Sequence, residues 1–161
     1  MIIFINGSIN AGKSTVAKML AQKIPNTALI EVDVFHDMIE WMSIDQSVPI
    51  NLANAVSIIK NFAERGLNVI VPYPLSQKNY DFMTQSLAAL NTKILFFTLA
   101  PTIDIAMSDR GERKLVDWQR KRIQHHYDIG IHNPAFGTII DNTHQTPEET
   151  TAQILNQIEK I

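Results

Sequence analysis

The chain has 161 residues, a formal net charge of −2 and no cysteine. This length suits one domain with a well-buried core, so we expect a single domain over residues 1–161. The slightly negative charge argues against a nucleic-acid-coating protein, which would carry a broad basic excess. The lack of cysteine excludes disulfide frameworks and thiolate metal sites. No stretch approaches the roughly 18 apolar residues of a membrane span, so we expect a cytoplasmic protein that does not bind membranes, either a monomer or a homodimer.

The chain opens with a predicted strand followed by a predicted helix. Residues 1–5 are continuously apolar, which is typical of a strand buried on both faces of a sheet. A helix is expected next, because apolar side chains recur at helical spacing until Pro25 ends the segment; they are Val16, Met19, Leu20 and Ile24.

The remaining chain alternates between predicted strands and helices. Apolar runs predict four more strands, at residues 28–33, 67–71, 94–99 and 137–141. Helical patterns fall between and after them, at residues 34–42, 52–63, 80–90, a short segment after 101, and 147–161, whereas residues 43–50 are predicted to be a loop. Five strands alternating with helices indicate an α/β fold, a doubly wound parallel sheet with helices on both faces.

The last helix has a clear start signal. Thr146 is the expected N-cap, Pro147 occupies the first helical position, and Glu149 completes a capping box.

Residues 7–14 read Gly-Ser-Ile-Asn-Ala-Gly-Lys-Ser and fit G-x-x-x-x-G-K-[ST], the phosphate-binding P-loop. Gly7 and Gly12 allow a tight turn whose N–H groups converge on a phosphate, and the following helix adds its positive dipole end. Lys13 would contact the β and γ phosphates, and the Ser14 hydroxyl could bind Mg²⁺. The predicted nucleotide-binding residues of this segment are Gly7, Ser8, Ile9, Asn10, Ala11, Gly12, Lys13, Ser14 and Thr15.

Carboxylates follow the second predicted strand, at the sheet edge where ligands of such folds bind. Asp33 is a candidate for Mg²⁺ binding, together with Ser14, or for accepting a proton from a substrate hydroxyl. Its alternative role is a helix N-cap. Glu31 and Asp37 are weaker candidates for the same roles, and the sequence leaves the choice among the three open.

Six of the 14 Lys and Arg residues fall between positions 110 and 122. A basic segment after the fourth strand could close over a triphosphate, so we expect a lid at about residues 109–136. Arg110 and Arg113 are the predicted catalytic arginines. Arg120 and Arg122 fit a solvated helix surface equally well. The nearby pair His125 and His126 points in different directions on a helix, so we expect no zinc site.

Together these segments resemble the small-molecule kinases of the P-loop superfamily, which include shikimate kinase, gluconate kinase, chloramphenicol phosphotransferase and tunicamycin-resistance proteins. The resemblance covers nearly the whole chain and depends on four segments: 7–15, 31–33, 110–113, and 140–143 with 147–149.

The resemblance implies the strand order 2-3-1-4-5, with ATP and Mg²⁺ as cofactors and a small-molecule alcohol as acceptor. It implies that Asp33 is the catalytic base. It also places Arg110 against the adenine, Arg113 at the phosphates, and Asn142 and Thr143 beside the base.

Departures from shikimate kinases bear on the acceptor. No Lys or Arg occurs between Lys23 and Lys60, where those enzymes hold a carboxylate. A neutral polyol, sugar or antibiotic-like alcohol is therefore favoured, unless a lid arginine binds an acid. The alternatives are a nucleotide, nucleoside or nucleotide-sugar kinase, in which Arg120 and Arg122 would hold a phosphate, and an ATP-binding switch module with no acceptor.

Overall fold

The computed structural model describes residues 1–109 and 114–160. Its strands pair in parallel in one sheet with the order β2-β3-β1-β4-β5, which confirms the predicted fold class and strand order. The strands are β1 (Ile2–Gly7), β2 (Thr27–Leu29), β3 (Asn68–Pro72), β4 (Ile94–Leu99) and β5 (Thr138–Ile140).

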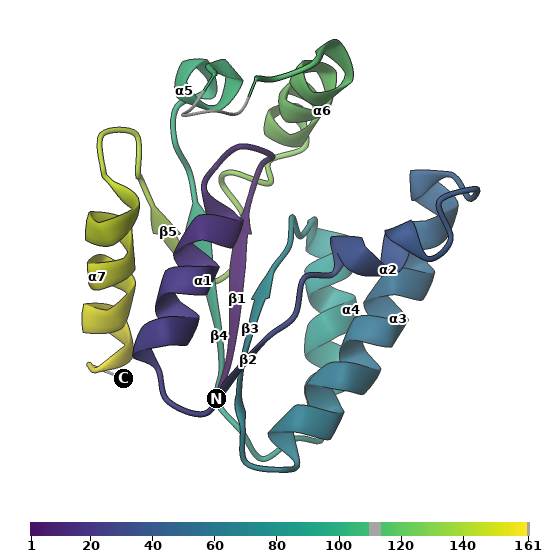
Figure 1. Ribbon diagram of the computed structural model, residues 1–161, viewed down its shortest axis with the longest axis vertical. Coiled ribbons are helices and arrows are strands. Elements are labelled where there is room, and N and C mark those ends of the chain that lie inside the picture. The colour runs from purple at the N-terminus through teal and green to yellow at the C-terminus, as the bar shows by residue number, and fades with distance from the viewer. Residues whose placement is uncertain (110–113, 161) are drawn as a thin grey trace.

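Helices cover both faces of the sheet (Figure 1). On one face lie α1 (Lys13–Lys23) and α7 (Pro147–Ile158), and on the other lie α3 (Ile44–Ala63) and α4 (Gln77–Leu87). Three shorter or peripheral helices lie toward the carboxyl ends of the strands: α2 (Asp33–Asp37), α5 (Ile103–Met107) and α6 (Asp117–Asp128).

The central strand β1 explains why the chain begins with an unbroken apolar run. Ile2 and Phe4 pack into the core under α3 and α4, while Ile3 and Ile5 pack into the core under α1 and α7. All four are essentially inaccessible to solvent. A strand covered on both faces needs apolar side chains at every position, because successive side chains point to opposite faces.

The prediction of a loop at residues 43–50 is wrong, because α3 already begins at Ile44. Pro49 lies inside this helix, where it cannot donate the usual backbone hydrogen bond and where proline disfavours helix by about 3 kcal/mol. The face that includes Leu52, Ala55 and Ile59 is buried against the sheet. Packing of this face against the sheet offsets the cost of the proline. A local sequence pattern does not reveal this packing.

Other predicted boundaries also differ from the structure, and the largest differences lie around α2. The predicted helix at residues 34–42 is the short helix α2, followed by turns at residues 38–42. The predicted strand at 28–33 ends at Leu29, because Asp33 already starts α2. The predicted start of α7 is confirmed: Thr146 and Glu149 exchange both capping hydrogen bonds, at 2.8 and 3.1 Å.

Within residues 1–109 and 114–160, no helix combines the length and the apolar character that crossing a membrane requires.

Gly137 precedes β5 at a point where the chain touches β4. Its φ is +68°, and a Cβ there would lie 2.4 Å from the Phe96 carbonyl oxygen. We predict that Gly137→Ala lowers the free energy of unfolding by about 3 kcal/mol, because backbone must move and the residue stays in a left-handed conformation. Urea unfolding measures the change.

Gly130→Ala is the matched control. Gly130 also has a positive φ, +77°, but a Cβ there would have no atom within 4 Å. The free energy of unfolding of this variant should fall by only about 1–2 kcal/mol, which is the cost of the left-handed conformation. Equal losses in the two variants would contradict the steric argument.

Candidate active site

The loop between β1 and α1 passes close to β4 and turns through backbone conformations that favour glycine. Gly7 has φ +138°, and a Cβ there would lie 2.5 Å from the Leu99 carbonyl oxygen. Gly12, the residue before α1, has φ +98°. The loop can therefore bring its N–H groups around one point at the start of α1, the geometry that binds an anion.

Side chains fix this loop on two sides. The Lys13 ammonium donates to the Ser8 carbonyl oxygen at 2.7 Å, so the lysine folds back over the loop. The Asn10 amide donates to the carbonyl oxygens of Ala106 and Ser108, both at 2.9 Å, which ties the loop to α5. The phosphate-binding conformation is thus supported by its own neighbours.

A cavity of about 420 Å³ lies beside the loop and is lined by Lys13, Ser14, Thr15 and Asn142 among others. The buried Asn142 amide donates to the Ala11 carbonyl oxygen at 3.0 Å. The Thr143 hydroxyl is instead engaged by Asp141 and the backbone N–H of Thr102. Of the two residues predicted beside the base, Asn142 lines this cavity.

The residues of this cavity fit a nucleoside triphosphate. Lys13 and the loop supply positive charge and N–H donors. The buried Asn142 Oδ1 has no hydrogen-bond partner among the described residues, so a donor on a nucleotide base would satisfy it. The Ser14 hydroxyl donates to Glu31 Oε2 at 3.4 Å. Hydroxyl and carboxylate oxygens are ligands that Mg²⁺ prefers.

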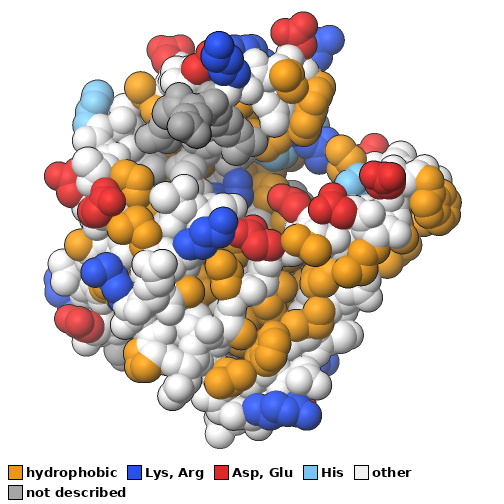
Figure 2. All heavy atoms as spheres, viewed as in Figure 1, with side chains coloured by type: hydrophobic (Ala, Val, Ile, Leu, Met, Phe, Trp, Pro, Cys, Tyr) orange, Lys and Arg blue, Asp and Glu red, His pale blue; other side chains and the backbone are white. Residues whose placement is uncertain are grey.

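A second cavity, of about 320 Å³, lies on the other side of Lys13. Its polar lining includes Asp33 and Asp37 of α2 and Arg122 of α6. Figure 2 shows the hollow between α6 and the end of α2 and α3, with acidic side chains along its α2 side. Asp33 thus belongs to the first turn of a helix and faces this cavity, whereas Glu31 contacts Ser14.

Tyr73 lines the second cavity together with the oppositely charged Asp33 and Arg122. Burial raises the pKa of its phenol to about 12, with a further contribution from Asp33 and an opposing one from Arg122. The phenol therefore stays neutral at physiological pH and can donate a hydrogen bond.

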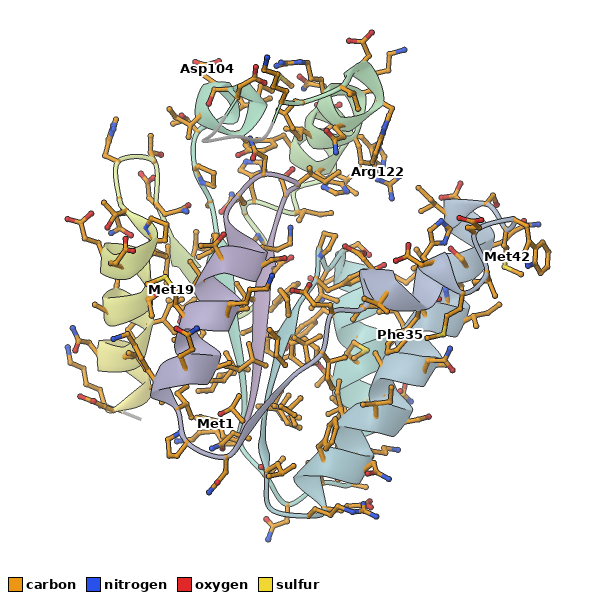
Figure 3. The ribbon with its side chains drawn as sticks, viewed as in Figure 1. Met1, Met19, Phe35, Met42, Asp104 and Arg122 are labelled. Atoms are coloured by element: carbon orange, nitrogen blue, oxygen red, sulfur yellow. The ribbon has the colours of Figure 1, made fainter. Side chains whose placement is uncertain are left out.

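The arginines of α6 have separate roles. Arg120 donates to the Met107 carbonyl oxygen and pairs with Asp109 at 3.2 Å, so it ties α6 to the end of α5. Arg122 extends on the side of α6 that faces α2 and α3 (Figure 3). Arg110 and Arg113 lie outside the described residues.

His126 has a role that the sequence did not reveal. It is 3% exposed, and its Nδ1 lies 3.3 Å from the Ser8 hydroxyl, in hydrogen-bond contact with the loop. Burial lowers its pKa to about 3, helped by the positive charges of Arg122, Lys13 and His125. A neutral imidazole therefore joins α6 to the phosphate-binding loop. The sequence offers no local signal for this contact, because Ser8 and His126 are far apart in the chain.

Other buried polar residues were also missed, among them Asn6, Ser47 and Asn51. Asn6 could have been noticed, since it is a polar residue directly after five apolar ones. Ser47 fell in the segment predicted to be a loop, and Asn51 directly followed that segment.

The fold and the site define a phosphotransferase of the P-loop class. The sequence matches the model of the chloramphenicol phosphotransferase-like protein family over residues 1–159. The chain belongs to this family, which confirms the resemblance to P-loop small-molecule kinases. The sequence has no significant match among curated proteins.

Solved structures share the fold at low sequence identity. The tunicamycin resistance protein of Deinococcus radiodurans is 20% identical, with a TM-score of 0.73 over 98% of this chain and 94% of that one. A sugar kinase from Janibacter is 18% identical, with a TM-score of 0.75 over 98% and 94%. A gluconokinase from Sinorhizobium meliloti is 19% identical, with a TM-score of 0.73 over 98% and 91%.

The lowered pKa of His126 predicts a pH-dependent stability. Below about pH 6.5 the unfolded chain binds a proton at this residue that the folded chain does not, so stability falls as the pH falls from about 6.5 toward 3. Between pH 7.5 and 5.0 the wild type should lose about 2 kcal/mol more than His126→Gln, as measured by urea unfolding.

The exposed His144→Gln variant controls for the loss of a histidine as such. Parallel pH profiles for wild type and His126→Gln would show that His126 is protonated without cost in the folded state, contrary to its burial.

Proposed function

We propose that this protein transfers the γ-phosphoryl group of ATP to a hydroxyl group of a small molecule. One observation carries the proposal: Lys13 lines both cavities, the one beside the phosphate-binding loop and the one that contains Asp33. A phosphoryl group that moves from the first cavity to the second would therefore pass close to the Lys13 ammonium group. Positioning and electrostatic stabilisation supply most of the catalysis in this reaction.

On the donor side, the loop N–H groups and Lys13 would hold the phosphates, and Asn142 would contact the base. Ser14 would hold Mg²⁺, and its contact with Glu31 favours that carboxylate over Asp33 as the second group at the metal. When bound, the ion would neutralise charge on the phosphate oxygens. This division leaves Asp33 for the acceptor.

On the acceptor side, Asp33 would orient the attacking hydroxyl and accept its proton. Arg122 is the described arginine of α6 that lines the same cavity, and it would neutralise charge on the phosphoryl group in transfer. The lid at about residues 109–136, with Arg110 and Arg113 over the donor, remains a prediction.

The rival functions fit the site less well. A nucleotide acceptor held by both Arg120 and Arg122 would require Arg120 to leave Asp109 and the Met107 carbonyl. An ATP-binding switch module has no acceptor, so it would not need the second cavity, which is lined by a carboxylate, a phenol and an arginine together with Lys13.

Asp33→Asn is predicted to reduce kcat for phosphoryl transfer at least about 100-fold while ATP binding is preserved, because the amide orients the hydroxyl but cannot take its proton. Mg-ATP turnover is measured with and without a panel of alcohols, and ATP affinity by calorimetry. Asp37→Asn, one turn along α2, is the matched control and should change kcat less than ten-fold. Transfer at the wild-type rate by Asp33→Asn would refute the base assignment.

Lys13→Ala is predicted to abolish alcohol-stimulated turnover and to weaken ATP binding, because it removes the positive charge between the two cavities. Single-turnover assays at saturating ATP separate the two effects. Turnover that survives this change would place the transfer elsewhere.

A further inference from the structure

One buried amide in the second cavity lacks a hydrogen bond. Asn51, on α3, is 4% exposed, and its Oδ1 has no partner among the described residues. Buried polar atoms in folded proteins are nearly always paired, because an unpaired one destabilises the fold. Asn51 lines the cavity that also contains Asp33. Thr84 and His132 each have an unpaired buried atom too, but neither lines this cavity.

Two polar residues that line the same cavity, His36 and Ser47, are already paired with each other. The Ser47 hydroxyl donates to the Ile44 carbonyl oxygen at 3.1 Å. Its single proton is thereby used, so it accepts from His36 Nδ1 at 3.0 Å. These bonds join α2 to α3 and fix the helix that carries Asp33. They leave the buried Asn51 carbonyl oxygen without a hydrogen-bond partner among the described residues.

Asn51 lies one helical turn after Ser47, so both residues are on the same face of α3. Asp33, His36 and Tyr73 border the same space. A molecule whose hydroxyl lies at Asp33 would therefore have another part near Asn51.

We infer that Asn51 is a specificity-determining residue of the acceptor site, and that the acceptor is an alcohol with a second hydrogen-bond donor, such as another hydroxyl or an N–H group. This inference depends on the proposed function, since it names the class of molecule that Asp33 would activate. An acceptor atom with no partner selects ligands that supply a donor, because a ligand without one leaves it unpaired.

The space beyond Asn51 indicates that this molecule has an apolar part. An adjoining cavity of about 360 Å³ shares Val48, Tyr73 and Arg122 with the second cavity. Its other lining residues include the apolar Leu52, Phe82, Ile129 and Ile131 and the polar Asp45, Lys78 and His125. Apolar walls with a few fixed polar groups are typical of small-molecule sites. A compound larger than a simple triol would fill both spaces.

The test uses chloramphenicol, gluconate and glucose as probes. Each probe is compared with an analogue in which a hydroxyl other than the one that is phosphorylated is methylated. Wild type, Asn51→Leu and Asn54→Leu are compared. Asn54 is an exposed asparagine on the same helix and serves as the matched control. Turnover with Mg-ATP gives kcat and KM. In ¹⁵N-labelled protein, the side-chain amide signals of Asn51, identified by their absence from Asn51→Leu, report binding without catalysis.

We expect at least one probe to be phosphorylated and to shift the Asn51 signals, and an analogue of that probe to be used less well. In Asn51→Leu, KM for the probe rises about ten-fold, KM for ATP is unchanged, and the preference over the methylated analogue disappears. Asn51→Leu also unfolds at higher urea concentration than wild type, because the unpaired atom is gone. Asn54→Leu behaves as wild type.

The outcomes separate this inference from the proposed function. Phosphorylation of a probe without a shift of the Asn51 signals, or with the preference retained in Asn51→Leu, overturns the inference and leaves the phosphotransferase standing. Shifts of the Asn51 signals without turnover of any probe support the binding site and count against the proposed reaction. Neither turnover nor shifts with any probe counts against both.

Discussion

The buried amide of Asn6 connects the parts of the molecule that form the active site. Its Nδ2 donates to the Thr98 hydroxyl at 3.0 Å and to the Ile131 carbonyl oxygen at 3.3 Å, and its Oδ1 accepts from the Leu75 N–H at 2.8 Å. These bonds join β4, the segment after α6 and the segment after β3 at the residue before Gly7. A fully buried and fully paired amide permits little movement, so the phosphate-binding loop and both cavities keep a fixed relation.

Two neutral hydrogen-bonding rings lie among the charges of the site. The neutral imidazole of His126 links α6 to the loop and feels the charges of Arg122 and Lys13, and the neutral phenol of Tyr73 lines the second cavity with Asp33 and Arg122. Burial keeps both rings uncharged, since ionisation in a low-dielectric site is costly. Both rings can therefore take part in hydrogen bonds without adding charge to the site.

The fold class and the conformation of the loop at residues 7–14 were predictable because their signals are local. The loop at residues 7–14 is defined by residue spacing, and the capping box at Thr146 by a four-residue pattern. The second cavity was less predictable. Residues 43–50 were expected to form a loop because they include Asp45, Ser47 and Pro49, yet the buried face of α3 extends the helix back to Ile44. Ser47 therefore escaped notice as a site residue, and so did Asn51 just beyond it.

The sequence by itself determined the strand order through its resemblance to P-loop kinases, the phosphate-binding loop and the acidic segment at residues 31–33. The loop and the acidic segment depend on neighbours in the chain, whose geometry is fixed by covalent spacing, whereas the resemblance alone implied the strand order. Only the tertiary structure separated Glu31, which contacts Ser14, from Asp33, which faces the second cavity. Likewise, only the tertiary structure brought His126 to Ser8. Such contacts join residues far apart in the sequence, and packing rather than local preference decides them.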